Sequence, residues 1–302
     1  MIQRKHLLCH PFTATLLTAV AVFCLWYVFY PQQMASDEQT TLFVWDKAFL
    51  SQYISTYGWT KTIKAFVAQF FYHPMQGALV IACASAALQW LCWLLLQKIC
   101  RKSNKAVKAV LFILSFLPTI WLNCQVGTAD AGTAEEQAYD LLLRKSDWDG
   151  IIKKSQTLTP TSPACRNAVA LARYFKGYGS ADEVFRSLTP TSQALTSKTA
   201  AQMMSDIYLF LGLPNLSQRA AFEAMEEGWN GRALHRLVET ALITGQYKVA
   251  GKYLGLLHHT LGYRKWALQT LPLLNHPEAI DQHPFYGKIR RMYTETQDQF
   301  FL

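Results

Sequence analysis

Three long apolar segments without a charged residue constrain the fold of this chain more than any other feature. They cover residues 12–30, 77–96 and 109–126, and they run for 19, 20 and 18 residues without Asp, Glu, Lys or Arg. About 20 apolar helical residues cross the roughly 30 Å hydrocarbon layer of a bilayer, whereas a buried soluble helix rarely stays uncharged for five turns. Pro118 interrupts the third segment, which Lys108 lengthens by snorkelling. The sequence therefore predicts three transmembrane helices.

Basic residues flank these segments on one side. Arg4 and Lys5 precede the first segment, and a cluster separates the second from the third: Lys98, Arg101, Lys102, Lys105 and Lys108. The positive-inside rule then places both groups in the cytoplasm and residues 127–302 in the exported compartment. The first segment is longer than the apolar region of a signal peptide, and the following YPQQMASD offers no small-x-small cleavage site, so we expect an uncleaved anchor.

The composition argues against several classes of function. Residues 1–126 hold 10 Lys and Arg against 3 Asp and Glu, and this surplus lies beside the apolar segments, so nucleic-acid binding is not predicted. Only Cys165 follows residue 126, which excludes a disulfide framework there. The chain contains no HExxH, Walker, GxSxG or GxGxxG motif. We therefore expect no enzyme activity, no cofactor and no metal.

An aromatic-rich segment lies between the first two apolar runs, in the predicted exported region 31–76. Residues 42–72 carry ten aromatic side chains and few charges, and Gly58 is expected to break them into two helical pieces. Aromatic rings favour the bilayer–water boundary. The pieces therefore lie along the outer membrane face or pack against the top of the spans.

The second half of the chain is periodic. Small residues recur 33 positions apart at Ser146, Gly179, Gly212 and Gly245. Apolar residues occupy the positions eight and four before most of them, which share one helix face. Five positions after them lie Ile151, Val184, Ser217 and Ala250. A helix, a turn and a second helix repeated every 33 residues predict an array of helical hairpins, with Gly212 and Gly245 in turns.

The repeats resemble tetratricopeptide repeats. In TGQYKVAGKYLGLL, the residues Gly245, Tyr247, Ala250 and Leu254 stand where that family has a turn glycine, an aromatic, a small and a large residue. The segment KSDWDGIIKKS shows the same order, and LGLPNLSQRAAFEAM follows it more loosely. The helix-opening Trp of the family is absent, so these are divergent repeats. The predicted fold is all-α: a membrane domain over 1–126, followed by a tetratricopeptide-like array over 127–302.

Longer segments are similar to a family of uncharacterised bacterial membrane proteins. These are FVAQFFYHPMQGALV, SDIYLFLGLPNLSQRAAFEAM and LVETALITGQYKVAGKYLGLLHHTLGYRKWA. The resemblance implies a bacterial inner-membrane location, with the repeats on the periplasmic side. It implies no activity.

The resemblance to tetratricopeptide repeats also implies a binding surface, because the first helix of each pair lines their concave groove. Transferring that register by position selects eight residues: Arg166, Arg173, Lys176, Gln202, Asp206, Arg232, His235 and Glu239. The surface would be polar with a basic end, suited to an acidic or carboxylate-bearing segment. The alternative is that these are solvated helix faces.

Three functions remain compatible with the sequence. The favoured one is a membrane-anchored scaffold that binds a protein or peptide partner in the cell envelope. The second is a structural accessory subunit whose spans pack into a larger transport or assembly complex. The third is an enzyme, which would need titratable residues clustered in a closed pocket.

Overall fold

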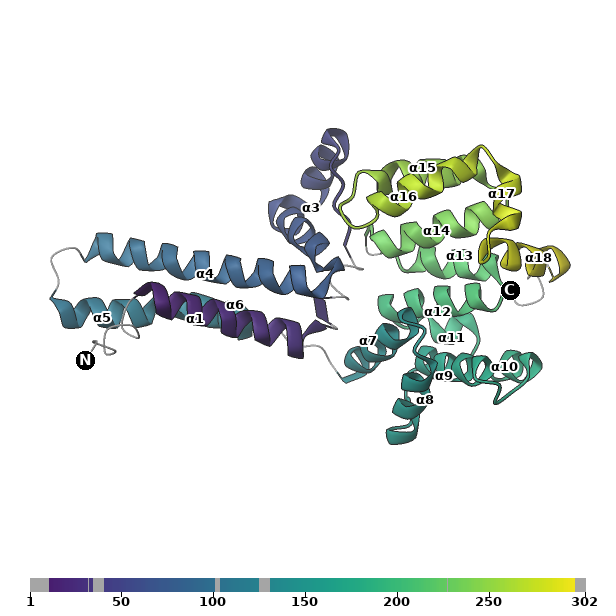
Figure 1. Ribbon diagram of the computed structural model, residues 1–302, viewed down its shortest axis with the longest axis horizontal. Coiled ribbons are helices and arrows are strands. Elements are labelled where there is room, and N and C mark those ends of the chain that lie inside the picture. The colour runs from purple at the N-terminus through teal and green to yellow at the C-terminus, as the bar shows by residue number, and fades with distance from the viewer. Residues whose placement is uncertain are drawn as a thin grey trace, which may run out of the picture. The chain divides into compact units, whose positions relative to one another are not determined.

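The computed structural model describes residues 11–31, 33–34, 41–100, 104–124, 131–226 and 228–296. These residues form helices and loops with no strand, which confirms the predicted all-α class (Figure 1). The chain divides into two compact units. The first comprises 1–34 and 70–128, and the second comprises 35–69 and 129–302.

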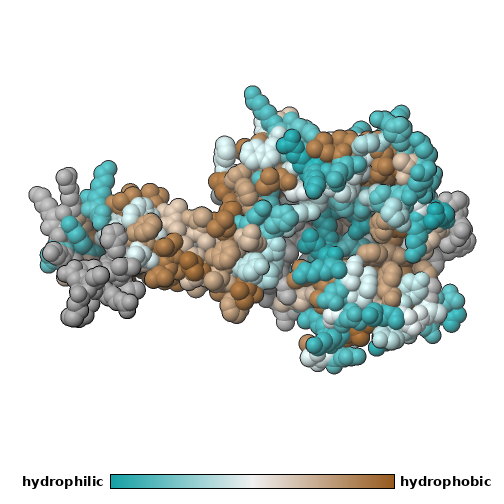
Figure 2. All heavy atoms as spheres, viewed as in Figure 1, coloured by the Kyte–Doolittle hydropathy of each residue, from teal (hydrophilic) through white to brown (hydrophobic). Residues whose placement is uncertain are grey.

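The first unit is built from the three apolar segments. Helix α1 (Pro11–Cys24) continues into the π-helical η1 (Leu25–Phe29), and α4 covers Pro74–Ile99. These two stretches are long and apolar enough to cross a membrane. The third segment forms two short helices, α5 (Lys105–Leu114) and α6 (Leu117–Cys124), because the helix breaks at Ser115. Hydrophobic residues cover much of the visible surface of these helices (Figure 2).

Buried polar side chains connect the three apolar segments. Gln89 on α4 accepts a hydrogen bond from Thr15 of α1 at 2.6 Å and donates one to Ser115 at 2.9 Å. The indole N–H of Trp26 donates to the Asn123 amide oxygen of α6 at 2.8 Å. Polar groups in an apolar bundle favour the arrangement that satisfies them, so these bonds fix how the helices pack.

The aromatic-rich segment belongs to the second unit up to residue 69, and its last three residues belong to the first unit. Residues 41–46 are extended, with Leu42 and Val44 buried and the Trp45 N–H donating to the His259 carbonyl at 2.8 Å. Helix α3 (Lys47–Ala68) follows, capped by the Asp46 carboxylate, and the 3₁₀ helix η2 covers Gln69–Tyr72. The break predicted at Gly58 is confirmed, since that residue has φ 78° and ψ 170°. The sequence-based division at residue 126 differs from this grouping because Leu42 and Val44 are buried in the core of the repeat unit.

The remainder of the second unit is a series of helical hairpins. Each pair has two helices joined by a short turn: α7 (Ala131–Arg144) and α8 (Trp148–Thr157); α9 (Pro163–Phe175) and α10 (Ala181–Ser187); α12 (Lys198–Phe210) and α13 (Pro214–Glu223); α14 (Gly231–Ile243) and α15 (Tyr247–His258). Helices α12, α13, α14 and α15 pack in succession (Figure 1). Shorter elements complete the unit: α11 (Thr191–Ala194), α16 (Arg264–Thr270), η3 (Leu271–Leu274), α17 (Pro277–Gln282) and α18 (Tyr286–Thr296).

The same turn joins the helices of all four pairs. Ser146, Gly177, Gly212 and Gly245 have φ between 52° and 78°. Each donates its N–H to the carbonyl three residues back, and the next residue donates to the carbonyl five back. This is the Schellman arrangement, which needs a left-handed residue. Gly212 and Gly245 are thus confirmed as turn residues. Gly179 also lies in the turn between its paired helices, but Gly177, two residues earlier, takes the left-handed position.

The positions five residues after the small residues of the 33-residue pattern are buried. Ile151, Val184, Ser217 and Ala250 are all at most 4% exposed. The apolar position four residues before the small residue is not buried in the α9 hairpin. There Phe175 is 40% exposed and stacks on Trp148 of α8, with ring centroids 4.7 Å apart. The turn of this hairpin comes two residues earlier than the strict 33-residue period.

Candidate functional site

The eight residues of the predicted groove fall into two separate groups. Arg166, Arg173 and Lys176 are exposed around α9. The other five converge between α12 and α14, where most of them are buried: Gln202, Asp206, Arg232, His235 and Glu239. The side chains of the second group bond to other residues of the same unit.

Two arginines of α14 connect carboxylates from three helices. Arg232 contacts Asp140 of α7 at 2.8 Å and also forms an ion pair with Asp206 of α12. Arg236 pairs with the same Asp206 and with Glu239 at 2.7 Å. Asp140, Asp206, Arg232 and Glu239 are 5–8% exposed. We call these five residues the ion network. Each of its charged groups has an oppositely charged partner inside the unit, so this part of the predicted groove is closed.

A helix cap extends the ion network. Gln202 lies 3.5 Å from Arg232 as an acceptor and donates to the side chain of Asn230 at 3.3 Å. Asn230 caps α14 by accepting from the Ala233 N–H at 2.7 Å, and it donates to the Ala224 carbonyl at 2.8 Å. Gln202 therefore orders the start of α14, which carries both arginines.

The two aspartates of the network titrate differently. Burial alone would raise the pKa of Asp206, but Arg232 and Arg236 outweigh it and lower that pKa to about 2. At Asp140, burial wins over the attraction of Arg232, and the nearby Asp206 adds repulsion, so the pKa is raised. Asp140 is thus the carboxylate that depends most on Arg232 for its charge.

His235 lies at the partly exposed end of the network. Its ring centroid is 3.9 Å from that of Trp266, and its Nδ1 is 3.5 Å from Glu239. Burial lowers the pKa of His235. Tyr286 donates to the other Glu239 oxygen at 3.2 Å. Within the part of the chain that the structure describes, no group of three His, Cys, Asp or Glu could hold a metal ion.

An open groove remains between α9 and α10. It has a volume of about 390 Å³, and its lining includes Arg166, Arg173, Tyr174, Tyr178 and Glu183. Arg166 donates to the Thr161 carbonyl at 2.6 Å, which holds its side chain along α9. We call this the α9–α10 groove. Two of the eight predicted residues therefore do line an open surface.

The other neighbours of this groove have defined roles. Lys176 is turned to Asp149 at 2.9 Å and does not line the groove. Glu183 accepts from the Ser180 N–H at 2.8 Å in the capping box that begins α10. Tyr178 is 70% exposed. Tyr174 and Tyr178 were not among the predicted residues, although two tyrosines around a glycine turn are a recognisable signal.

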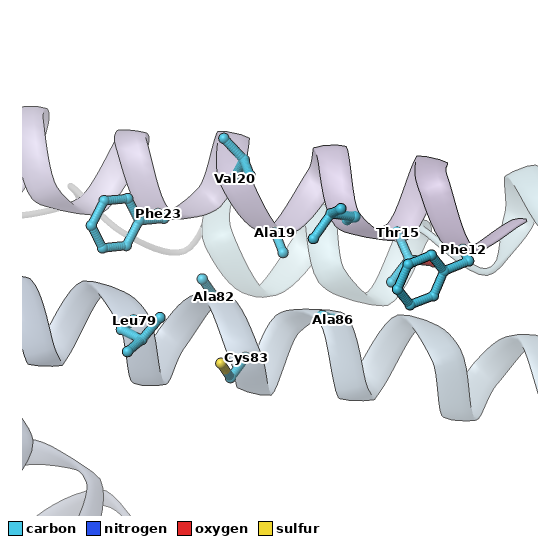
Figure 3. Close-up of a pocket in the computed structure, with 10 residues that line it drawn as sticks. Phe12, Thr15, Ala19, Val20, Phe23, Leu79, Ala82, Cys83 and Ala86 are labelled. Carbon is cyan, nitrogen blue, oxygen red and sulfur yellow. The ribbon is translucent and has the colours of Figure 1, made fainter. Parts of the chain in front are cut away.

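The first unit carries a second, purely apolar groove. It lies between α1 and α4 with a volume of about 480 Å³. Figure 3 shows the rings of Phe12 and Phe23 toward its two ends, with Ala19 and Ala82 between them. Small side chains let two helices approach closely. Among the described residues that line it, Thr15 bonds to Gln89 and Cys83 has a free thiol, and the rest are apolar, so the groove offers mainly shape.

The fold and the grooves define an all-α protein that combines two long apolar helices with an array of helical hairpins. The chain belongs to a family of unknown function (DUF6057), which it matches over residues 5–128 and 123–302. No curated protein matches it. No solved structure matches it either.

Proposed function

We propose that this chain is a membrane-anchored helical-repeat scaffold that binds a protein or peptide segment in the α9–α10 groove. The observation that carries the proposal is the contrast between its arginines. Arg232 is buried, Arg236 is mostly buried, and both are paired with carboxylates, whereas Arg166 and Arg173 line an open groove beside two exposed tyrosines. Within the described residues, Arg173 has no ion-pair partner.

The side chains of the groove favour an acidic or carboxylate-bearing segment. Guanidinium groups bind carboxylates through paired, charge-assisted hydrogen bonds. Tyrosine adds contact area with little loss of rotamer freedom, which is why it is common in binding surfaces. The Glu183 carboxylate accepts a hydrogen bond from the Ser180 N–H at the N-terminus of α10. It repels an acidic group only at the α10 end of the groove. The proposed partner is thus a segment whose carboxylate lies near Arg166 and Arg173, and the proposal assigns the chain no catalytic step.

Membrane anchoring is supported by exposure and by hydrogen bonds. Only 11% and 22% of the apolar windows in Pro11–Phe29 and Pro74–Ile99 are buried within the chain, so water would face most of their apolar surface outside a membrane. Thr15 and Trp26 bond to Gln89 and Asn123, which supports an uncleaved first helix. The distribution of Lys and Arg favours a cytoplasmic N-terminus and exported repeats, and the resemblance noted in the sequence adds a bacterial inner membrane to the proposal.

Site-specific photo-crosslinking tests the groove. A photoreactive phenylalanine replaces Tyr178 in the full chain expressed in its native membrane, and an equivalent substitution at the exposed Lys248 of α15 is the control. We expect one discrete adduct from position 178 and none from 248. The double charge reversal R166E/R173E should abolish that adduct and leave thermal unfolding unchanged, because both arginines are exposed. An adduct that survives this reversal contradicts the proposed groove.

Reporter fusions test the orientation. A fusion after Leu302 should report the exported compartment, and one at Asn104 should report the cytoplasm. A cytoplasmic signal from Leu302 would show that an even number of segments crosses the membrane, with the kinked α5–α6 pair the first candidate for exclusion.

The apolar groove between α1 and α4 favours one alternative, an accessory subunit of a larger transport or assembly complex. Its volume of about 480 Å³ lies on apolar helices that would face lipid. A span from another subunit would fit such a surface. Crosslinks from Leu79 to another membrane protein, combined with none from position 178, would favour this alternative over the scaffold.

A further inference from the structure

A second polar pocket of the repeat unit lies between α3 and the segment that leads into α14. Its volume is about 310 Å³. The residues that matter for recognition are Phe49, Gln52, Tyr53, Tyr57, Trp229 and Leu256. We call it the aromatic pocket. It shares no residue with the α9–α10 groove.

The sequence of α3 places three of these rings on one helix face. Phe49, Tyr53 and Tyr57 are spaced four apart, and successive ring centroids are 5.7 and 4.7 Å from each other. The Asp46 cap fixes the start of this row, and the left-handed Gly58 ends it. The ring of Phe49 meets Trp229 edge to face, with centroids 6.3 Å apart. Four aromatic rings therefore surround one hollow.

Trp229 is held in place by its neighbours in the chain. Gly228 adopts φ 137°, which side chains rarely allow. The next residue, Asn230, is fully buried and makes the capping bonds of α14. The backbone of Trp229 is thus constrained, and its ring, which is 38% exposed, contacts Phe49 at the wall of the pocket. The pocket is prepared for a ligand without rearrangement of its backbone.

The polar groups of the pocket are neutral. Within the described part of the chain, the Gln52 amide and the hydroxyls of Tyr53 and Tyr57 form no hydrogen bond, so they are available to a ligand. Burial and the neighbouring Tyr57 raise the pKa of Tyr53, so its hydroxyl remains a donor. None of the described residues that line the pocket is charged.

We propose that the aromatic pocket binds a neutral sugar, specifically a pyranose ring with equatorial hydroxyls. The C–H faces of such a ring stack on aromatic rings, and its hydroxyls both donate to and accept from amide and phenol groups. The described residues that line the pocket offer no charged group that could bind a phosphate or a carboxylate directly. The volume is at the lower end for ligand sites, which suits a mono- or disaccharide.

Two other occupants fit the pocket less well. Aromatic cages also bind quaternary ammonium groups, but the Lys61 ammonium lies 5.4 Å from the Tyr57 ring centre and repels a second cation. A lipid surface would be met by outward aromatic rings such as Trp59, which is 68% exposed. The rings of Phe49, Tyr53 and Tyr57 are instead partly buried toward Trp229.

Saturation-transfer NMR on the full-length chain tests the proposal. The chain is held in a polyoxyethylene detergent, because the headgroups of glycosidic detergents would compete. Glucose, galactose, N-acetylglucosamine and cellobiose are the probes, and tetramethylammonium is the competing cation. We expect saturation of the C–H protons of at least cellobiose. W229A should weaken binding at least tenfold, and Q52A several-fold, which corresponds to one lost hydrogen bond. Gln52 is exposed, so Q52A leaves folding intact.

The matched control is W59A, because Trp59 belongs to the same helix and lines a different hollow with Trp45. It should not change sugar binding, and neither should R166E/R173E, which keeps this test separate from the scaffold proposal. The proposal is overturned if none of the four sugars receives saturation, if W229A and Q52A bind as the unaltered chain does, or if tetramethylammonium binds in their place.

Discussion

Removing the Arg232 guanidinium should destabilise the repeat unit strongly. Arg232→Met keeps much of the side-chain volume but leaves Asp140, which is 5% exposed, without its closest cation. Breaking a buried ion pair from one side costs about 3–5 kcal/mol. Asp206 retains Arg236, so the loss falls mainly on Asp140. For a unit of this size, about 2–4 °C per kcal/mol gives a fall in Tm of about 6–20 °C.

The assay is thermal unfolding of the full chain in detergent, followed by near-ultraviolet circular dichroism at pH 7. D140N/R232M should recover at least half of the loss, because it removes the uncompensated carboxylate together with its partner. The exposed Arg173→Met is the control for loss of one positive charge, and it should change Tm by only about 1 °C. A double variant no more stable than R232M would refute the idea that an uncompensated Asp140 causes the loss.

Three further outcomes follow from particular contacts. The pKa of Asp206 in the folded chain is about 2, below its ordinary value, so its ionised carboxylate stabilises the fold at every pH above that ordinary value. This contribution, about 2 kcal/mol, should fade as pH falls toward 2. It should be missing from the pH profile of unfolding of D206N. Gly58→Ala should destabilise by about 1–3 kcal/mol in denaturant titration, because φ 78° with ψ 170° is a glycine conformation and no atom obstructs the added methyl. Gln89→Leu should lower the Tm of the apolar bundle in detergent, because it removes the hydrogen bonds to Thr15 and Ser115, worth about 0.6–1.7 kcal/mol each. The exposed Leu91→Ala is the control and should leave the Tm unchanged.

The repeats could be predicted because their signals are local. A helix, a left-handed turn and a second helix each leave a mark within about ten residues, and Gly212 and Gly245 carry that mark directly. Gly179 shows the limit of a strict period. The four turn residues are spaced 31, 35 and 33 apart, so the mean period passes through Gly179 while the turn forms at Gly177.

The ion network could not be predicted because its contacts are distant in sequence. Asp140 and Arg232 are 92 residues apart, and each alone resembles a polar residue on a solvated helix face. The same holds for Leu42 and Val44, whose burial depends on repeat helices about 200 residues later. The interruption predicted at Pro118 is present but lies three residues earlier, at Ser115, because Pro118 occupies the first turn of α6, where a missing N–H is tolerated.

The difference between the two groups of arginines comes from the neighbouring helices. On α14, Arg232 and Arg236 face Asp140 of α7 and Asp206 of α12, so the array supplies its own anions across three helices. On α9, Arg173 has no such carboxylate among the described residues, and the Arg166 guanidinium is bonded to a neutral carbonyl. An exposed guanidinium beside a groove retains most of its capacity for a charge-assisted bond, whereas a buried, paired one has already used it. Recognition of an acidic partner should therefore concentrate at the α9–α10 hairpin, while α7, α12 and α14 supply the rigid support on which that hairpin depends.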